Sequence, residues 1–218
     1  MIVTAVERQP RRRRVNVFVD GHFALTLSAE LAAERGVRPG RAVTPDELST
    51  LALAEAQRAA LQSGLLLLSY RPRSERELRD RLARKGFAGE AIDQAIARLR
   101  VLGYLDDAAF ARFWTETRQA LRPRSRRVLV GELRRRGVAG ETAQEASAGV
   151  SDLDAAYEAA SRRLRHLRNL EHRVFRERLG RFLTSRGFAY DVSRRVIERC
   201  WAEEHTSSEA TEPTYAAN

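Results

Sequence analysis

The chain has 218 residues, of which 43% are hydrophobic and 31% are charged, a composition typical of a folded protein. Its single cysteine, Cys200, excludes an intramolecular disulfide and a cysteine-cluster metal site. The longest aliphatic run, Leu65–Leu68, is far shorter than the ~20 residues that span a bilayer. Because the N-terminus also lacks an apolar signal core, we expect a cytoplasmic protein with no membrane partner.

The net charge of +10 is concentrated in the middle of the chain. Residues 66–202 carry 30 basic against 18 acidic side chains, whereas residues 203–218 carry four glutamates and no Lys or Arg. A field of this kind attracts polyanions, so nucleic acid or a nucleoprotein is the first partner class to consider. Residues 203–218 contain few large apolar groups, and we expect them to form a disordered acidic tail.

Residues 1–44 are predicted to form a β-hairpin extension. A short strand is expected at Ile2–Val6, and apolar residues alternate over 15–19 and again over 23–27. Asp20-Gly21 lies between the two alternating stretches and favours a tight type I′ turn. Ser28 is then placed to cap a short helix that stops at Gly36.

Capping signals predict the next two helices. Thr44-Pro45-Asp46-Glu47 is a capping box with proline at the first helical position, which predicts a linking helix over 45–69. A second box, Ser74-Glu75-Arg76-Glu77, opens the following helix.

From residue 70 onward the sequence repeats. Arg71-Pro72-Arg73-Ser74 recurs as Arg122-Pro123-Arg124-Ser125, and the pattern Leu-x3-Leu-x3-Gly occurs at 78–86, 129–137 and 179–187. A period of about 50 residues indicates an array of similar units. We therefore predict a mainly α fold of tandem three-helix repeats forming an elongated curved array, with repeats at 70–120, 121–169 and 170–202. The third is expected to be short.

Candidate catalytic groups are better explained as structural ones. Asp106-Asp107 and the pair Asp152 and Asp154 resemble carboxylate pairs for Mg²⁺, but their shared position in the repeat favours helix caps. Cys200 is expected in the core rather than as a nucleophile. There is no phosphate-binding loop and no metal-ligand spacing. We expect no enzymatic activity, no cofactor, no metal and no small-molecule ligand.

The aromatic residues at 110–114 can be interpreted in two ways. Phe110, Phe113 and Trp114 could stack on nucleobases, but their helical spacing favours burial in a core.

Clustered arginines are the strongest functional signal. Runs of arginine recur near helix ends, which favours a surface that faces a polyanion or an acidic protein. The candidate partner- or DNA-binding residues are Arg71, Arg73, Arg122, Arg124, Arg126, Arg127, Arg134, Arg135, Arg162 and Arg165.

Several motifs together resemble the RecX family, regulators of the RecA recombinase. They are Ser69-Tyr70-Arg71-Pro72-Arg73-Ser74-Glu75, Lys85-Gly86-Phe87, Leu102-Gly103-Tyr104-Leu105-Asp106-Asp107 and Phe110-Ala111. The stretches 14–21 and 36–48 resemble the N-terminal extension of longer family members, so the resemblance covers about residues 1–202.

The resemblance implies a non-enzymatic modulator that binds the groove of the RecA–single-stranded DNA filament. It also implies suppression of ATP hydrolysis, strand exchange and the coprotease role of the filament, and hence links to recombination, DNA repair and the SOS response. Single-stranded and double-stranded DNA are both candidate nucleic-acid partners. Two alternatives stay open: a direct DNA- or RNA-binding module that acts without RecA, and a helical scaffold for acidic proteins.

Overall fold

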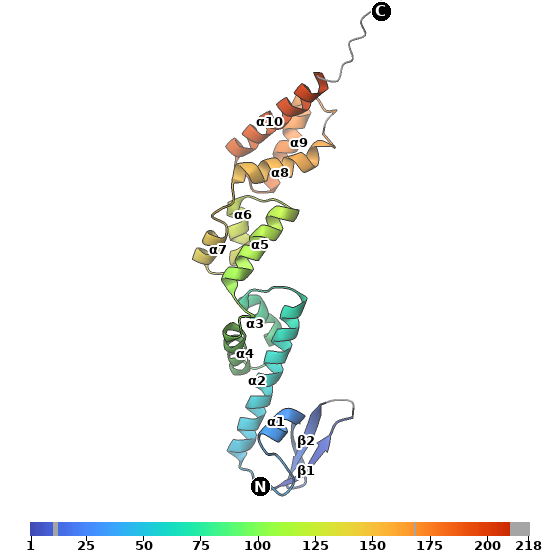
Figure 1. Ribbon diagram of the computed structural model, residues 1–218, viewed down its shortest axis with the longest axis vertical. Coiled ribbons are helices and arrows are strands. Elements are labelled where there is room, and N and C mark those ends of the chain that lie inside the picture. Colours follow the sequence, from blue (N-terminus) through green and yellow to red (C-terminus); the bar gives the residue numbers. More distant parts are fainter. Residues whose placement is uncertain (11–12, 168, 210–218) are drawn as a thin grey trace, which may run out of the picture. The chain divides into compact units, whose positions relative to one another are not determined.

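A computed structural model describes residues 1–10, 13–167 and 169–209 of the chain. The chain divides into two compact units, Met1–Asp106 and Asp107–Asn218. The model is mainly helical with one small antiparallel sheet, which confirms the expected fold class (Figure 1). No helix of the described part is long and apolar enough to cross a membrane.

The first unit begins with a three-stranded antiparallel sheet in the order β1 (Val3–Arg8), β2 (Arg14–Val19) and β3 (His22–Ser28). Asp20 and Gly21 connect β2 to β3 with φ angles of 50° and 83°, which confirms the predicted two-residue turn. Ser28 accepts a hydrogen bond from the amide of Leu31 and so caps α1 (Ala29–Glu34).

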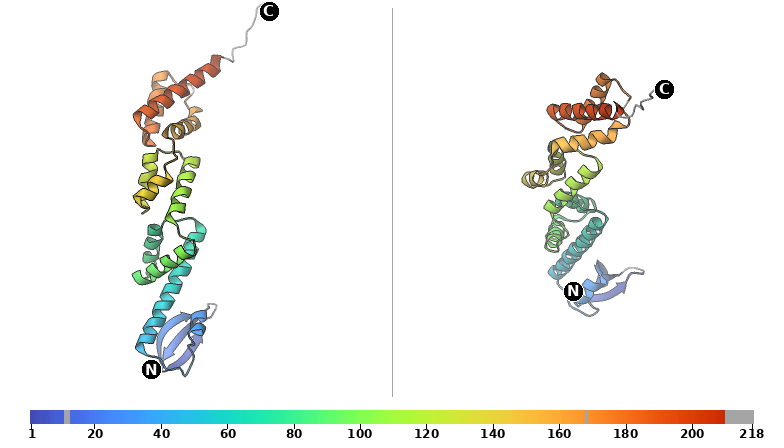
Figure 2. Two further views of the ribbon diagram at one scale, coloured as in Figure 1. Left: turned by 60° about the vertical axis from the view of Figure 1, so that its left-hand side comes forward. Right: turned by 45° about the horizontal axis from the view of Figure 1, so that its top comes forward.

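A long helix, α2 (Pro45–Tyr70), carries the chain away from the sheet (Figure 2). The predicted capping box is present, with Glu47 N donating to Thr44 Oγ1 at 3.1 Å and Thr44 N donating to Glu47 Oε2 at 2.9 Å. Farther along, the buried carboxylate of Glu55 accepts from the amide of Ser28 and pairs with Arg14, which ties the helix to the sheet.

The second half of α2 packs against α3 (Glu75–Arg84) and α4 (Gly89–Val101). Gly64 allows the close approach of α4, because a Cβ there would lie 2.8 Å from Leu99 Cδ1. These three helices form the first bundle.

The second unit contains two further bundles. The second bundle comprises α5 (Asp107–Leu121), α6 (Arg126–Arg135) and α7 (Gly140–Ala146), and the third comprises α8 (Asp152–Leu164), α9 (His172–Ser185) and α10 (Tyr190–Glu209). In each bundle the middle helix presents paired leucines to the core, such as Leu129 with Leu133 and Leu179 with Leu183.

The bundles are shifted by one helix from the repeats expected at 70–120, 121–169 and 170–202. The helix before each middle helix belongs to the same bundle, so α2 is more than a linking helix and the third bundle has three helices. The Arg-Pro-Arg-Ser turn, which occurs twice in the chain, lies inside a bundle rather than at its boundary.

Three local expectations differ from the structure. Phe113 is exposed, whereas Phe110 is buried as expected. Ser151 caps α8, in place of Asp152 or Asp154. Helix α10 continues to Glu209, well past the predicted start of the tail at residue 203, and residues 210–218 lie outside the described residues.

Candidate nucleic-acid interface

The Arg-Pro-Arg turn of the first bundle uses its two arginines differently. Arg73 is 7% exposed, and its Nε donates to the carbonyl oxygen of Leu67 at 3.0 Å while NH1 pairs with Glu77 at 2.7 Å. Arg71 is exposed and also pairs with Glu77. The expectation that Arg73 contacts a partner is therefore corrected, because its buried guanidinium already binds the Leu67 carbonyl and the Glu77 carboxylate.

Burial and mutual pairing shift the pKa values of Arg73 and Glu77. The pKa of Arg73 is lowered, first by burial and then by the charge of Arg71. Burial raises the pKa of Glu77, but hydrogen bonds and charges from Arg71 and Arg73 outweigh it, so that the net pKa is lowered. Glu77 therefore stays ionised and holds both arginines.

In the second bundle the equivalent turn is anchored by another carboxylate. Val128 stands where Glu77 stands in the first bundle, and Glu132 takes over the anchoring role. It accepts from Trp114 Nε1 and Arg118 Nε at 3.0 Å each, and its second oxygen lies 3.4 Å from Arg124 Nε. Trp114 is thus fixed by hydrogen bonding, and the guanidiniums of Arg118 and Arg136 lie over its ring at 4.4 and 3.7 Å from the centroid, where a base would stack.

The second and third bundles meet at this turn. Arg186, at the C-terminal end of α9, donates to the carbonyl oxygen of Pro123 at 3.2 Å, and its own carbonyl accepts from the amide of Ser125. Arg162 of α8 donates to the carbonyl of Leu121 at 3.1 Å. Carbonyls at the end of α5, which carry partial negative charge, therefore orient cations from two other helices.

These contacts gather positive charge into one place, here called the junction cluster. It consists of Arg122, Arg124, Arg162, Arg163 and Arg186. The pKa of Arg186 is lowered, first by burial and then by the charges of the four other members, which repel its own charge. Glu132 pairs with Arg124 and Glu158 with Arg162, so five guanidiniums face two carboxylates within the described residues.

A shallow basic groove between α8 and α9 lies next to the junction cluster. Its lining residues are Arg163, His166, Leu167, Arg178, Arg181, Phe182 and Ser185. Both Arg163 and Arg186 lie over the ring of Phe182, with guanidinium-to-centroid distances of 5.0 and 4.8 Å. A guanidinium this close to an aromatic ring is attracted to the face of the ring, so Phe182 helps to hold both arginines in place.

Helix α6 of the second bundle carries further exposed arginines. Arg126, Arg127, Arg134 and Arg135 are exposed, as is Arg165 after α8. The amide of Arg126 donates to Asp152 Oδ1 at 2.7 Å, so Asp152 serves the start of α6 instead of capping its own helix.

Most arginines of the junction cluster and of α6 are among the candidates expected from the sequence, but Arg163 and Arg186 are not. A signal for Arg186 is present, because a basic residue precedes the helix-ending glycine in all three bundles, as Lys85, Arg136 and Arg186. The long-range contact of Arg186 with Pro123 has no local signal.

Metal-ligand clusters and the single cysteine are the remaining candidate chemical groups. No three His, Cys, Asp or Glu side chains gather there in a way that could hold a metal ion. Cys200 is fully buried, as expected, and burial raises the pKa of its thiol to about 11. The thiol is therefore protonated at neutral pH and a poor nucleophile.

Four family models match the chain. They are the RecX N-terminal domain over residues 1–44 and the first, second and third RecX three-helix domains over residues 60–99, 106–146 and 151–197. The three helical matches follow the bundles seen in the structure.

Known proteins agree with these matches. The regulatory protein RecX of Lacticaseibacillus paracasei is 29% identical over 192 residues, covering 85% of this chain and 79% of its own length. That of Clostridium beijerinckii is 27% identical, with coverages of 92% and 96%. A crystal structure of regulatory protein RecX superposes with a TM-score of 0.68 at 22% identity, covering 90% of this chain and 98% of that one. RecX from Lactobacillus salivarius gives a TM-score of 0.59 at 20% identity, over 67% of this chain and 97% of that one.

Proposed function

Because the chain belongs to the RecX family of regulatory proteins, we propose that it regulates the RecA recombinase by binding the RecA–single-stranded DNA filament. In this proposal it lies in the helical groove of the filament, in the cytoplasm, and inhibits ATP hydrolysis, strand exchange and coprotease activity. It catalyses no reaction of its own and needs no cofactor.

The junction cluster is the observation that carries this proposal. Five arginines from the α5–α6 turn, α8 and α9 concentrate positive charge that two carboxylates only partly balance. A nucleoprotein groove offers both DNA phosphates and protein carboxylates, and the planar guanidinium fork can bind either with two parallel hydrogen bonds.

Rigidity of the cluster favours tight binding. Arg162 and Arg186 are already oriented by main-chain carbonyls, and Arg163 by the ring of Phe182. Side chains that are ordered before binding lose less conformational entropy when they meet a partner. Inhibition would then follow from an array of bundles that occupies the groove and resists the filament's conformational changes.

The decisive experiment compares two partners of the full chain. Co-sedimentation with RecA filaments and inhibition of RecA ATPase are measured beside a mobility shift on bare single-stranded DNA. We expect binding and inhibition at concentrations where bare DNA is only weakly shifted. Failure to co-sediment or inhibit would overturn the proposal.

A paired variant tests the cluster itself. Arg122→Gln with Arg163→Gln removes two cluster charges, and Arg76→Gln with Arg98→Gln removes two exposed charges from the first bundle as a matched control. We expect weaker inhibition for the first pair alone. Equal inhibition by both pairs would remove the junction cluster from the interface.

Direct binding to nucleic acid without RecA is the second candidate function. The basic groove between α8 and α9 favours it, because a positive groove that tracks a phosphate backbone is sufficient for sequence-independent binding. A strong shift of bare DNA combined with no effect on RecA would select this function.

A further inference from the structure

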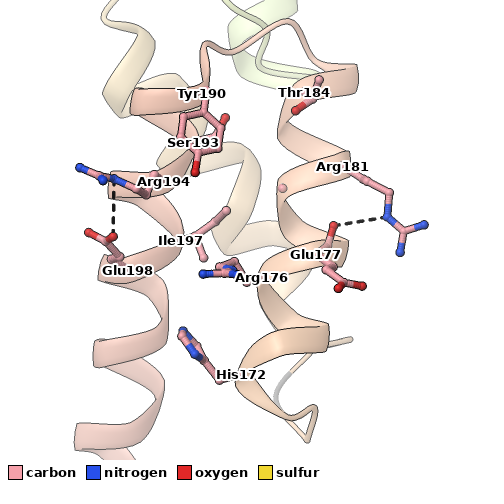
Figure 3. Close-up of a pocket in the computed structure, with 11 residues that line it drawn as sticks. His172, Arg176, Glu177, Arg181, Thr184, Tyr190, Ser193, Arg194, Ile197 and Glu198 are labelled. Atoms are coloured by element: carbon pink, nitrogen blue, oxygen red, sulfur yellow. Dashed lines mark hydrogen bonds and ion pairs between the residues drawn. The ribbon is translucent and has the colours of Figure 1, made fainter.

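A second cavity, separate from the junction cluster, lies between α9 and α10 of the third bundle (Figure 3). Its volume is about 530 Å³, within the ~300–1,000 Å³ range of small-molecule sites. Gly180 of α9 and Ile197 of α10 form its floor, and a Cβ at Gly180 would lie 3.7 Å from Ile197 Cδ1. The absence of a side chain at position 180 keeps this α9–α10 slot open.

In the first bundle, ion pairs connect the positions on α3 and α4 that are equivalent to those lining the slot. Arg79 occupies the position equivalent to Gly180 and pairs with both Glu75 and Asp93 across α3 and α4. In the third bundle the positions of Glu75 and Asp93 hold Arg176 and Arg194. The third bundle therefore has no bridging arginine here and has basic residues at both positions that are acidic in the first bundle, so neither ion pair can form across the slot.

Polar and aromatic groups line the open slot. Ser193 is 4% exposed, and its Oγ has no hydrogen-bond partner among the described residues. Tyr190 stands at one end and is 83% exposed. Arg176 and His172 lie between the two helices in Figure 3, and the ring of His172 packs on Trp201 at a centroid distance of 4.7 Å.

We propose that the α9–α10 slot binds one unpaired nucleobase of single-stranded DNA, with the adjoining phosphate on Arg176. The inference rests on the proposed function, since it names how this chain holds the DNA strand of the filament. Tyr190 supplies the stacking face, and Ser193 supplies a hydrogen bond to the base edge. An aromatic platform beside a basic groove is the usual arrangement for binding single strands.

An apolar side chain of a protein partner fits the slot less well. It would leave the hydroxyl of Ser193, which is already buried, without a hydrogen-bond partner. A base has hydrogen-bond donors and acceptors on its edge, so it can pair with the hydroxyl of Ser193. The rim carboxylates do not repel a phosphate strongly, because Glu198 pairs with Arg194 and Glu177 with Arg173.

The test uses the full chain without RecA and compares a fluorescent oligothymidylate with an abasic strand of equal length. The parent is expected to bind the base-bearing strand about fivefold or more tightly, the effect of stacking one base. Gly180→Leu fills the slot and should abolish this preference. Gly131→Leu is the matched control, because it places the same side chain on α6, where a Cβ meets only Arg135 NH1 at 4.0 Å.

Milder variants guard against misfolding of the leucine variant. Tyr190→Ala and Ser193→Ala should each reduce the preference while circular dichroism stays unchanged. Equal binding of both strands by the parent, or a preference that survives Gly180→Leu, overturns the proposal. Loss of RecA inhibition in Gly180→Leu with an intact base preference also overturns it, in favour of a protein side chain in the slot. Failure of the RecA experiments above would leave this binding assay unaffected, so the two proposals fail separately.

Discussion

The backbone of Gly187 lies directly against the side chain of Val128, so closely that a Cβ on the glycine would come within 2.2 Å of Val128 Cγ2. The glycine ends α9 with φ +87°, and the valine belongs to the first turn of α6. This approach also brings Ser125 N to the carbonyl of Arg186. The contact joins the second and third bundles and holds Arg186 in the junction cluster.

Gly187→Ala is therefore expected to destabilise the second unit strongly. The positive φ alone costs an alanine about 1–2 kcal/mol, and the clash with Val128 adds about 1–3 kcal/mol. Gly86→Ala is the matched control, because Gly86 has the same φ of +87° at the end of α3 but open space around its Cβ. Urea unfolding measures both variants, and equal losses would show that the Val128 contact contributes nothing.

The two arginines of the first turn should differ in their effect on stability. Arg73→Ala leaves the Leu67 carbonyl and the Glu77 carboxylate short of a buried charged donor, which costs about 1.5–3 kcal/mol. Arg71→Ala removes an exposed pair and should cost less than about 1 kcal/mol. Thermal unfolding distinguishes them, and a larger loss for Arg71→Ala would reverse the assignment.

Acid sensitivity should follow from Glu77. Its pKa is lowered in the folded chain, so its contribution to stability is complete above the ordinary glutamate pKa and is lost as the pH falls through the lower folded value. Glu77→Gln should lower stability at neutral pH and flatten the decline on acidification. Unfolding curves at several pH values test this, and an unchanged acid slope in the variant would contradict it.

Local rules predicted the helix ends well and the arginine contacts poorly. The Asp20-Gly21 turn and the Thr44 capping box depend on neighbours within a few residues, so the sequence alone was sufficient. Arg73 could not be distinguished from Arg71 in this way, because its acceptor is the carbonyl at the end of the preceding helix. The partner of a long side chain is decided by the tertiary arrangement.

Tertiary contacts also explain why the repeat boundaries and the contact between Arg186 and Pro123 could not be predicted from the sequence. Hydrophobic spacing found the middle helix of each bundle, but helix-to-helix contacts decide whether α2 and α8 belong with the helices that follow them. Arg186 and Pro123 are 63 residues apart, so no periodicity could bring them together. Asp152 was expected to cap its own helix, yet Ser151 does so and frees Asp152 for the amide of Arg126.

Helix α10 makes a specific contact beyond the expected start of the tail. Tyr157 OH donates to Glu203 at 2.7 Å, and Arg199 pairs with the same carboxylate at 2.8 Å. A chain ending at Ala202 should therefore melt about 1–4 °C below one ending at Glu209, because it lacks this exposed network of weak contacts. Glu203→Ala in the full chain should reproduce the shift. Identical melting of all three would show that the network is without effect.

The exposed arginines of α6 give the sharpest test of the DNA partner. Arg126, Arg127 and Arg134 are exposed and absent from the core, so replacing all three by glutamine should preserve helicity. If each meets one phosphate, the slope of log affinity against log salt should fall in magnitude by about 0.7 per residue on single-stranded DNA, or about 2 in total. Contacts to RecA carboxylates would be weakened by salt without this counterion-release slope.

The matched control replaces three exposed arginines of the first bundle, Arg76, Arg84 and Arg98, by glutamine and so removes the same net charge. A general effect of charge would change both slopes equally, whereas a local interface on α6 would change only the first. The α6 variant is then assayed for inhibition of RecA ATPase at one salt concentration, with circular dichroism as the folding control. A folded α6 variant with the parental salt slope and parental inhibition would exclude this helix from contact with either partner, because three lost phosphate or carboxylate contacts cannot leave both measurements unchanged.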